Sequence, residues 1–142
     1  MSTSNNRTKV WTRIDLTFRA STNFDNPYAD ALVWVDLEGP DFSRRVYGFW
    51  NGGDEWVVRV LANAPGEWHW TSGSSPNDTG LSGQSGRFVA ESWTAAELDT
   101  NPNRRGMIGA SANGRGLQYA DGTPFFLLGD TWWSLPSFRF PL

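Results

Sequence analysis

Residues 9–19 alternate between apolar and polar side chains, which predicts a half-buried strand of an antiparallel sheet. The apolar residues on the face expected to point inward are Val10, Ile14, Leu16 and Phe18. Trp11 falls on the opposite face, beside Lys9, Arg13 and Asp15. We therefore expect Trp11 to be the tryptophan most exposed to solvent.

Further apolar runs follow at intervals of about 8 to 12 residues and are separated by turn residues, a spacing typical of all-β domains. These runs are residues 31–37, 45–50, 55–61, 67–71 and 86–90. Two glycines in Asn51-Gly52-Gly53-Asp54 predict a hairpin between the second and third runs, because glycine adopts positive φ without strain. The polar stretch 72–86 is expected to be an exposed loop, with Leu81 as its apolar anchor. The pattern predicts an all-β, immunoglobulin-like antiparallel sandwich over residues 9–91.

The residues outside this range have other patterns. Residues 1–8 form a polar tail, and residues 92–105 have the composition of a linker with at most a short helix. Within residues 106–142, a hairpin is expected around Ala120-Asp121-Gly122. The run Pro124 to Leu128 is apolar on both faces, as in a parallel sheet that is covered on both sides. We expect this tail to be the beginning of a domain whose remaining strands lie beyond the chain.

Composition narrows the function classes. The 142 residues include 9 Trp and 9 Phe but no Cys, so disulfides, thiol catalysis and cysteine-based metal sites are excluded. The net charge of −3 with no basic cluster argues against nucleic-acid binding, and no apolar window is long enough for a membrane helix. His69 is the single histidine and is expected on a polar strand face, so we predict no metal and no cofactor. The amino-terminal residues lack the apolar stretch of a secretory signal, which leaves the localisation open.

Several stretches of the chain resemble known protein families. Four of them together resemble the N-terminal β-sandwich domain of unknown function in bacterial proteins predicted to be glycoside hydrolases. They are Asn26-Pro27-Tyr28, residues 46–53, residues 56–60 and residues 66–70. Residues 119–133, which end in Gly129-Asp130-Thr131-Trp132-Trp133, resemble the first strand of an apiosidase-like (β/α)8 catalytic domain. The resemblance implies that residues 106–142 are the amino-terminal fragment of such a barrel.

The resemblance also implies a function for the parent protein. A glycoside hydrolase cleaves the glycosidic bonds of a polysaccharide with two carboxyl groups, which in this family lie on later strands of the barrel. The chain is therefore expected to be inactive by itself, with no catalytic residue of its own and with the barrel as its partner. In the intact parent, Asp130, Thr131, Trp132 and Trp133 are expected to bind the sugar, because they follow a barrel strand at its carboxyl end.

Two other functions remain open from the residues alone. The sandwich could be a free-standing carbohydrate-binding module, with Trp11 as the residue that stacks on the sugar. It could also be a structural spacer in which all the tryptophans are internal. Trp56 alternates with Val58 and is expected in the core, whereas Trp34 lies between two valines and its side is left open.

Overall fold

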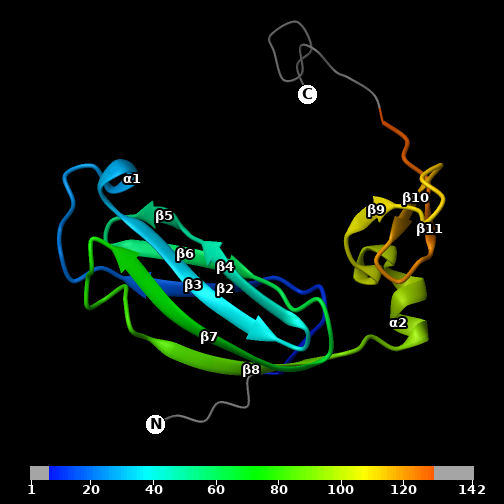
Figure 1. Cartoon of the computed structure of the whole chain (residues 1–142), viewed down its shortest axis with the longest axis horizontal. Coiled ribbons are helices and arrows are strands. Elements are labelled where there is room, and N and C mark those ends of the chain that lie inside the picture. The colour runs from blue at the N-terminus through cyan, green and yellow to red at the C-terminus, as the bar shows by residue number, and fades with distance from the viewer. Residues whose placement is uncertain (1–6, 130–142) are drawn as a thin grey trace, which may run out of the picture. The chain divides into compact units, whose positions relative to one another are not determined.

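The computed structural model describes residues 7–129, which divide between Gly106 and Met107 into two compact units. The first unit is a sandwich of two β-sheets (Figure 1). One sheet has the strand order β1-β8-β7-β3-β4, and the other has the order β2-β6-β5. The strands are β1 (Arg7–Lys9), β2 (Ile14–Arg19), β3 (Leu32–Gly39), β4 (Phe42–Tyr47), β5 (Phe49–Gly52), β6 (Glu55–Val60), β7 (Gly66–Ser75) and β8 (Ser85–Glu91). The predicted all-β sandwich is confirmed.

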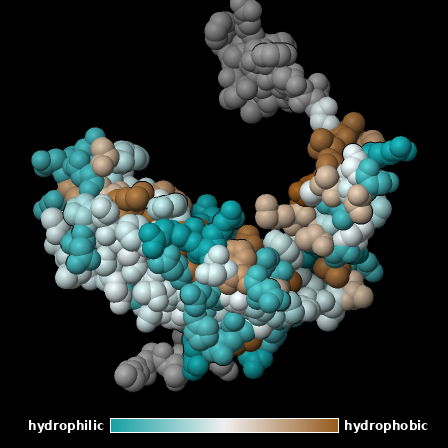
Figure 2. Space-filling view, viewed as in Figure 1, coloured by the Kyte–Doolittle hydropathy of each residue, from teal (hydrophilic) through white to brown (hydrophobic). Residues whose placement is uncertain are grey.

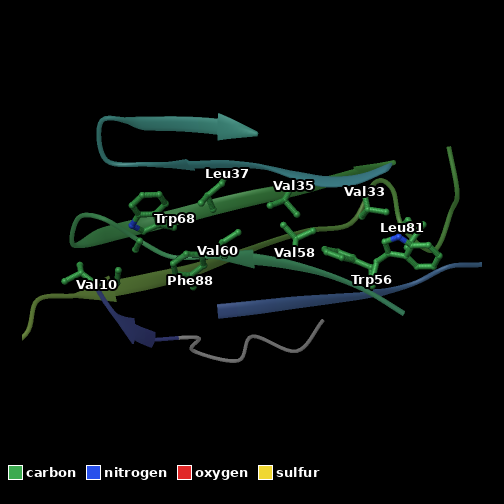
Figure 3. Packing of buried hydrophobic residues seen from close by; sticks show 13 residues of the cluster. Val10, Val33, Val35, Leu37, Trp56, Val58, Val60, Trp68, Leu81 and Phe88 are labelled. Atoms are coloured by element: carbon green, nitrogen blue, oxygen red, sulfur yellow. The ribbon is translucent and has the colours of Figure 1, made fainter. Parts of the chain in front are cut away.

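The core lies between the two sheets, as Figure 3 shows. Alternate residues of each strand point into it, because successive side chains of a strand face opposite sides of the sheet. The five-stranded sheet contributes Val33, Val35, Leu37, Trp68 and Phe88, and the three-stranded sheet contributes Phe18, Trp56, Val58 and Val60. Trp56 is therefore internal, as the alternation predicts.

Residues 9–19 do not form one strand, and this prediction is wrong. β1 pairs in parallel with β8, whereas β2 pairs with β6 of the other sheet, so the chain crosses from sheet to sheet at residues 10–13. The crossing is a turn in which Trp11 has a positive φ of 61°. Because this turn interrupts the alternation, Trp11 does not share a strand face with Lys9 and Arg13. Instead it is partly buried against the core.

The run 45–50 is likewise divided between the two sheets. β4 ends at Tyr47 and β5 begins at Phe49, with Gly48 between them. A Cβ at Gly48 would lie 2.7 Å from the carbonyl oxygen of Val57, so only glycine fits this close passage. The hairpin that follows is confirmed: β5 and β6 are joined through Gly52 and Gly53, both with positive φ.

The stretch 72–86 is not simply an exposed loop, and this prediction is also wrong. β7 continues to Ser75, and the side chains of Ser72, Ser74, Asp78 and Leu81 are buried. The carboxylate of Asp78 accepts hydrogen bonds from the backbone N–H of Ser21 (3.0 Å) and of Gly80 (2.8 Å). These bonds satisfy a buried polar group and attach the loop to the residues after β2, which composition alone does not reveal.

The segment after β8 is attached to the sandwich by Trp93 and by Lys9, whose ammonium donates to the carbonyl of Ser92 (3.0 Å). The indole N–H of Trp93 donates to the carbonyl of Val10 (2.8 Å), and the Arg104 guanidinium lies 4.3 Å from the centroid of the Trp93 ring. Residues 92–105, expected to be a linker, carry α2 (Ala95–Thr100) and the 3₁₀-helix η1 (Pro102–Arg105). The remaining helix of this unit is α1 (Pro27–Asp30), and no helix within residues 7–129 is long and apolar enough to cross a membrane. The domain boundaries stay a prediction.

The second unit contains a small antiparallel sheet with the order β11-β10-β9. Its strands are β9 (Ile108–Ala110), β10 (Leu117–Tyr119) and β11 (Pro124–Phe125). The hairpin around residues 120–122 is as predicted, whereas the sequence pattern does not predict β9. The expected strand over 124–128 is shorter than predicted: β11 has two residues, and Phe126, Leu127 and Leu128 are exposed. Figure 2 shows hydrophobic residues gathered on this unit.

Candidate functional site

Of the sequence-predicted sugar-binding residues, the structure describes Trp11 alone. Asp130, Thr131, Trp132 and Trp133 lie outside the described residues. Trp11, the predicted stacking residue, is partly buried in the turn between β1 and β2. Its role in sugar binding stays a prediction, but the exposed strand face on which that prediction was based is absent.

The outer face of the five-stranded sheet carries a more exposed group of aromatic and charged residues. The register aligns Tyr47 of β4, Trp34 of β3 and Gly73 of β7 in one row across the sheet. Arg45 and Asp36 occupy the row next but one, two residues before Tyr47 on β4 and two residues after Trp34 on β3. Residues two apart share a face, so these side chains lie together on the side away from the core. We call Trp34, Tyr47, Arg45 and Asp36 the Trp34 corner.

Within the Trp34 corner, the indole of Trp34 lies flat over Gly73. A Cβ at Gly73 would stand 2.6 Å from the indole ring, so a larger residue would displace it. The Arg45 guanidinium lies 4.5 Å from the centroid of the Trp34 ring, a cation–π geometry. Tyr47 meets Trp34 edge to face, with ring centroids 6.5 Å apart. Trp34 is therefore held from several sides and only partly exposed, whereas the Tyr47 residue is 57% exposed.

The charged pair of the Trp34 corner is held in a forked geometry. Arg45 donates from Nε (2.8 Å) and Nη2 (2.9 Å) to the two carboxylate oxygens of Asp36. These hydrogen bonds lower the pKa of Asp36 and raise the pKa of Arg45, because each charge stabilises the other. Both groups thus stay charged at neutral pH, with their charges cancelled locally.

The remainder of the outer face is mostly polar, although the apolar residues Leu32 and Val89 are also exposed on it. His69 lies on it beside Glu67 and Arg87, as the alternation predicts. Arg87 pairs with Glu67 at 3.1 Å, and the sandwich surface seen in Figure 2 is mostly hydrophilic. Within residues 7–129, no cluster of three or more histidine or acidic side chains could hold a metal ion.

Several carboxyl groups of the sandwich unit take part in ion pairs, a helix cap or a loop. The pKa of Asp15 is lowered by hydrogen bonds from Arg59, and that of Glu97 is lowered by hydrogen bonds from Thr94. Burial raises the pKa of Asp78, but hydrogen bonds from Ser21, Thr22 and Gly80 outweigh this effect and lower it to about 2. A general acid in glycoside hydrolysis needs a raised pKa, the opposite of these shifts.

Comparison with solved structures shows that the fold of this chain also occurs within a larger protein. The crystal structure of a "putative glycoside hydrolase" from Bacteroides vulgatus is similar to it, with a TM-score of 0.69 and 21% sequence identity. The match covers 85% of this chain and 21% of that chain, so this chain spans about a fifth of the length of that protein. The TM-score shows a shared fold, and at 21% identity the match shows nothing beyond the fold.

About half of the chain also resembles a protein domain family that has no assigned function. Residues 7–75 match a family model described as a domain of unknown function, DUF5060. This match confirms, for these residues, the predicted resemblance to a domain of unknown function. No curated protein matches the chain.

The Trp34 corner is not evident from the sequence, because Trp34 is flanked by Val33 and Val35 and the run therefore looks apolar on both faces. One signal was present. Asp36 and Glu38 follow Trp34 at steps of two, so a strand that places them outward also places Trp34 outward.

Proposed function

We propose that the sandwich is a non-catalytic accessory domain of a glycoside hydrolase that acts on polysaccharides. The structural match carries this proposal, since 85% of the chain superposes on a fifth of a protein described as a "putative glycoside hydrolase". The match of residues 7–75 to a domain without an assigned activity agrees with an accessory role.

The non-catalytic role is supported by the carboxyl groups of the sandwich. Asp15 and Asp36 form forked ion pairs with arginines, and Asp78 holds a loop. Glycoside hydrolysis needs one carboxylic acid that is still protonated at the working pH, and it needs a second carboxyl group across the bond. A carboxyl whose pKa is lowered cannot supply the proton.

The finer part of the proposal concerns the catalytic partner. We infer from residues 119–133 that it is an apiosidase-like (β/α)8 barrel that begins within residues 106–142. In that protein Asp130, Thr131, Trp132 and Trp133 would lie at the carboxyl end of a barrel strand and contact the sugar.

Hydrolysis assays on two proteins test the proposal. The 142-residue chain and the product of the complete reading frame are incubated with a panel of plant and microbial polysaccharides, and released reducing ends are measured. We expect release by the complete product and none by the 142-residue chain. Hydrolysis by the 142-residue chain would overturn the non-catalytic role. A complete product that is inactive on every polysaccharide would overturn the assignment to a glycoside hydrolase.

A further inference from the structure

The Trp34 corner combines an exposed aromatic ring with a charged pair on an outer sheet face. Tyr47 lies at the end of β4, on an outer sheet face, with 57% of its surface exposed. An exposed aromatic ring leaves apolar area in contact with water, at a cost of roughly 25 cal/mol per Å² that a bound ligand recovers. We propose that the Trp34 corner binds a neutral glycan chain. The inference rests on the proposed function and names a ligand site for the accessory domain.

The first support is that the aromatic groups are already in place. The indole of Trp34 is held between Gly73 below it, Arg45 at 4.5 Å and the edge-to-face ring of Tyr47. Little side-chain freedom is left for a ligand to remove, and such preorganisation favours affinity. The phenol ring of Tyr47 is rigid and amphipathic, with an apolar face and a hydroxyl that can hydrogen-bond. A sugar presents the complementary surfaces, C–H groups on one face and hydroxyls around its rim.

The second support is the charge of the corner. Asp36 and Arg45 are bound to each other through two hydrogen bonds, so the pair offers acceptors and donors with no net charge. A ligand that carried a charge would compete with one member of the pair and leave the other without its partner. A neutral polyhydroxylated chain can hydrogen-bond to both members without separating them. The next strand of the sheet adds Thr71, which is aligned with Asp36 and exposed.

The other exposed aromatic residues of the sandwich lack this combination. Tyr28 is 80% exposed and meets Trp50 at the short helix α1, with no charged pair in that contact. Phe49 lies on the outer face of the three-stranded sheet, where the Arg59 guanidinium is 5.3 Å from its ring centroid. The Asp15–Arg59 pair lies beside Phe49, but within residues 7–129 no second ring meets Phe49 as Trp34 meets Tyr47. Tyr28 and Phe49 therefore serve as controls that show whether any exposed aromatic residue of the sandwich would bind the polysaccharide.

Affinity gel electrophoresis of the 142-residue chain tests the proposal. Native gels contain arabinoxylan, mixed-linkage β-glucan, xyloglucan or galactomannan, and a gel with polygalacturonate tests an anionic chain. We expect at least one neutral polysaccharide to retard the protein, with Tyr47→Ala weakening the dissociation constant about tenfold or more. Tyr28→Ala and Phe49→Ala are expected to bind as the unchanged protein does.

A second variant tests the contribution of the Asp36–Arg45 pair independently of the Tyr47 ring. Asp36→Asn is expected to weaken retardation while keeping the near-UV circular dichroism of the fold, because Asp36 lies on the surface. Retardation by none of the neutral polysaccharides would overturn the proposal. So would unchanged binding by Tyr47→Ala, a loss caused by Phe49→Ala instead, or stronger retardation by polygalacturonate. Because the hydrolysis assay on the complete protein does not depend on this corner, failure of the site leaves the proposed function standing.

Discussion

Replacement of Asp78 by asparagine tests how the polar loop after β7 is held. The Asp78 side chain is buried, and its oxygens accept hydrogen bonds from the Ser21 backbone (3.0 Å), the Ser21 hydroxyl (2.9 Å) and the Gly80 backbone (2.8 Å). A pKa lowered from 3.8 to about 2 corresponds to about 2 kcal/mol of folding free energy at neutral pH. An amide keeps one acceptor oxygen but presents an NH₂ group toward donors, so we expect Asp78→Asn to cost about 2 to 3 kcal/mol at pH 7.

The stability that the Asp78 carboxylate contributes is expected to depend on pH, which distinguishes its charge from its packing. The pKa of Asp78 is lower in the folded protein than in the unfolded chain, so the stability it contributes is fully present above about pH 5. That contribution is lost as the pH falls through the folded pKa of about 2. The difference between the unchanged protein and Asp78→Asn should therefore be largest at pH 7 and become smaller toward pH 2.

Urea unfolding followed by tryptophan fluorescence at pH 7, 5, 3 and 2.5 measures this difference. Asp25→Asn, in the exposed segment before α1, is the matched control and should leave the free energy of unfolding within about 0.5 kcal/mol. A midpoint for Asp78→Asn equal to that of the unchanged protein, or a difference that does not change with pH, would refute the reasoning.

Three further substitutions test the packing. Gly39→Ala places a Cβ against the fully buried indole of Trp68 and should cost about 1 to 3 kcal/mol, measured as a lower melting temperature. Leu81→Ala removes a buried side chain and should cost about 2 to 5 kcal/mol in urea unfolding. Trp93→Phe removes the hydrogen bond to the carbonyl of Val10 and should cost about 1 kcal/mol, with faster proteolysis of residues 92–105.

Each of these three has a result that would contradict it. A melting temperature unchanged by Gly39→Ala would mean that the indole of Trp68 can move aside. If Leu81→Ala behaved as a surface substitution, the loop would be exposed, as its composition suggests. An unchanged cleavage rate in Trp93→Phe would show that the segment after β8 is held by contacts other than this hydrogen bond.

The strands could largely be predicted from the sequence, because the alternation of side chains is local. Trp68 and Trp70 share the inner face and His69 faces outward, as the period of two requires. The hairpin at Gly52 and Gly53 could also be predicted, because it depends on the conformational preference of glycine alone.

The crossings between sheets could not be predicted, because they depend on contacts between distant residues. Trp11 adopts a positive φ, which its sequence neighbours do not suggest, where its backbone N–H meets the carbonyl of Ala62. The burial of Asp78 depends on Ser21, 57 positions away. The Trp34 corner depends in the same way on Gly73, which leaves room for the indole on the neighbouring strand.

The strand β1 covers part of the edge of the five-stranded sheet, although it has only three residues. By pairing in parallel with β8, it occupies the backbone groups that β8 would otherwise offer at the margin of the sheet. A recombinant fragment that started at Val10 would leave that margin open to strands of neighbouring copies and would favour self-association at high concentration. Domain boundaries chosen for expression should therefore include Arg7, whose side chain also pairs with Glu91.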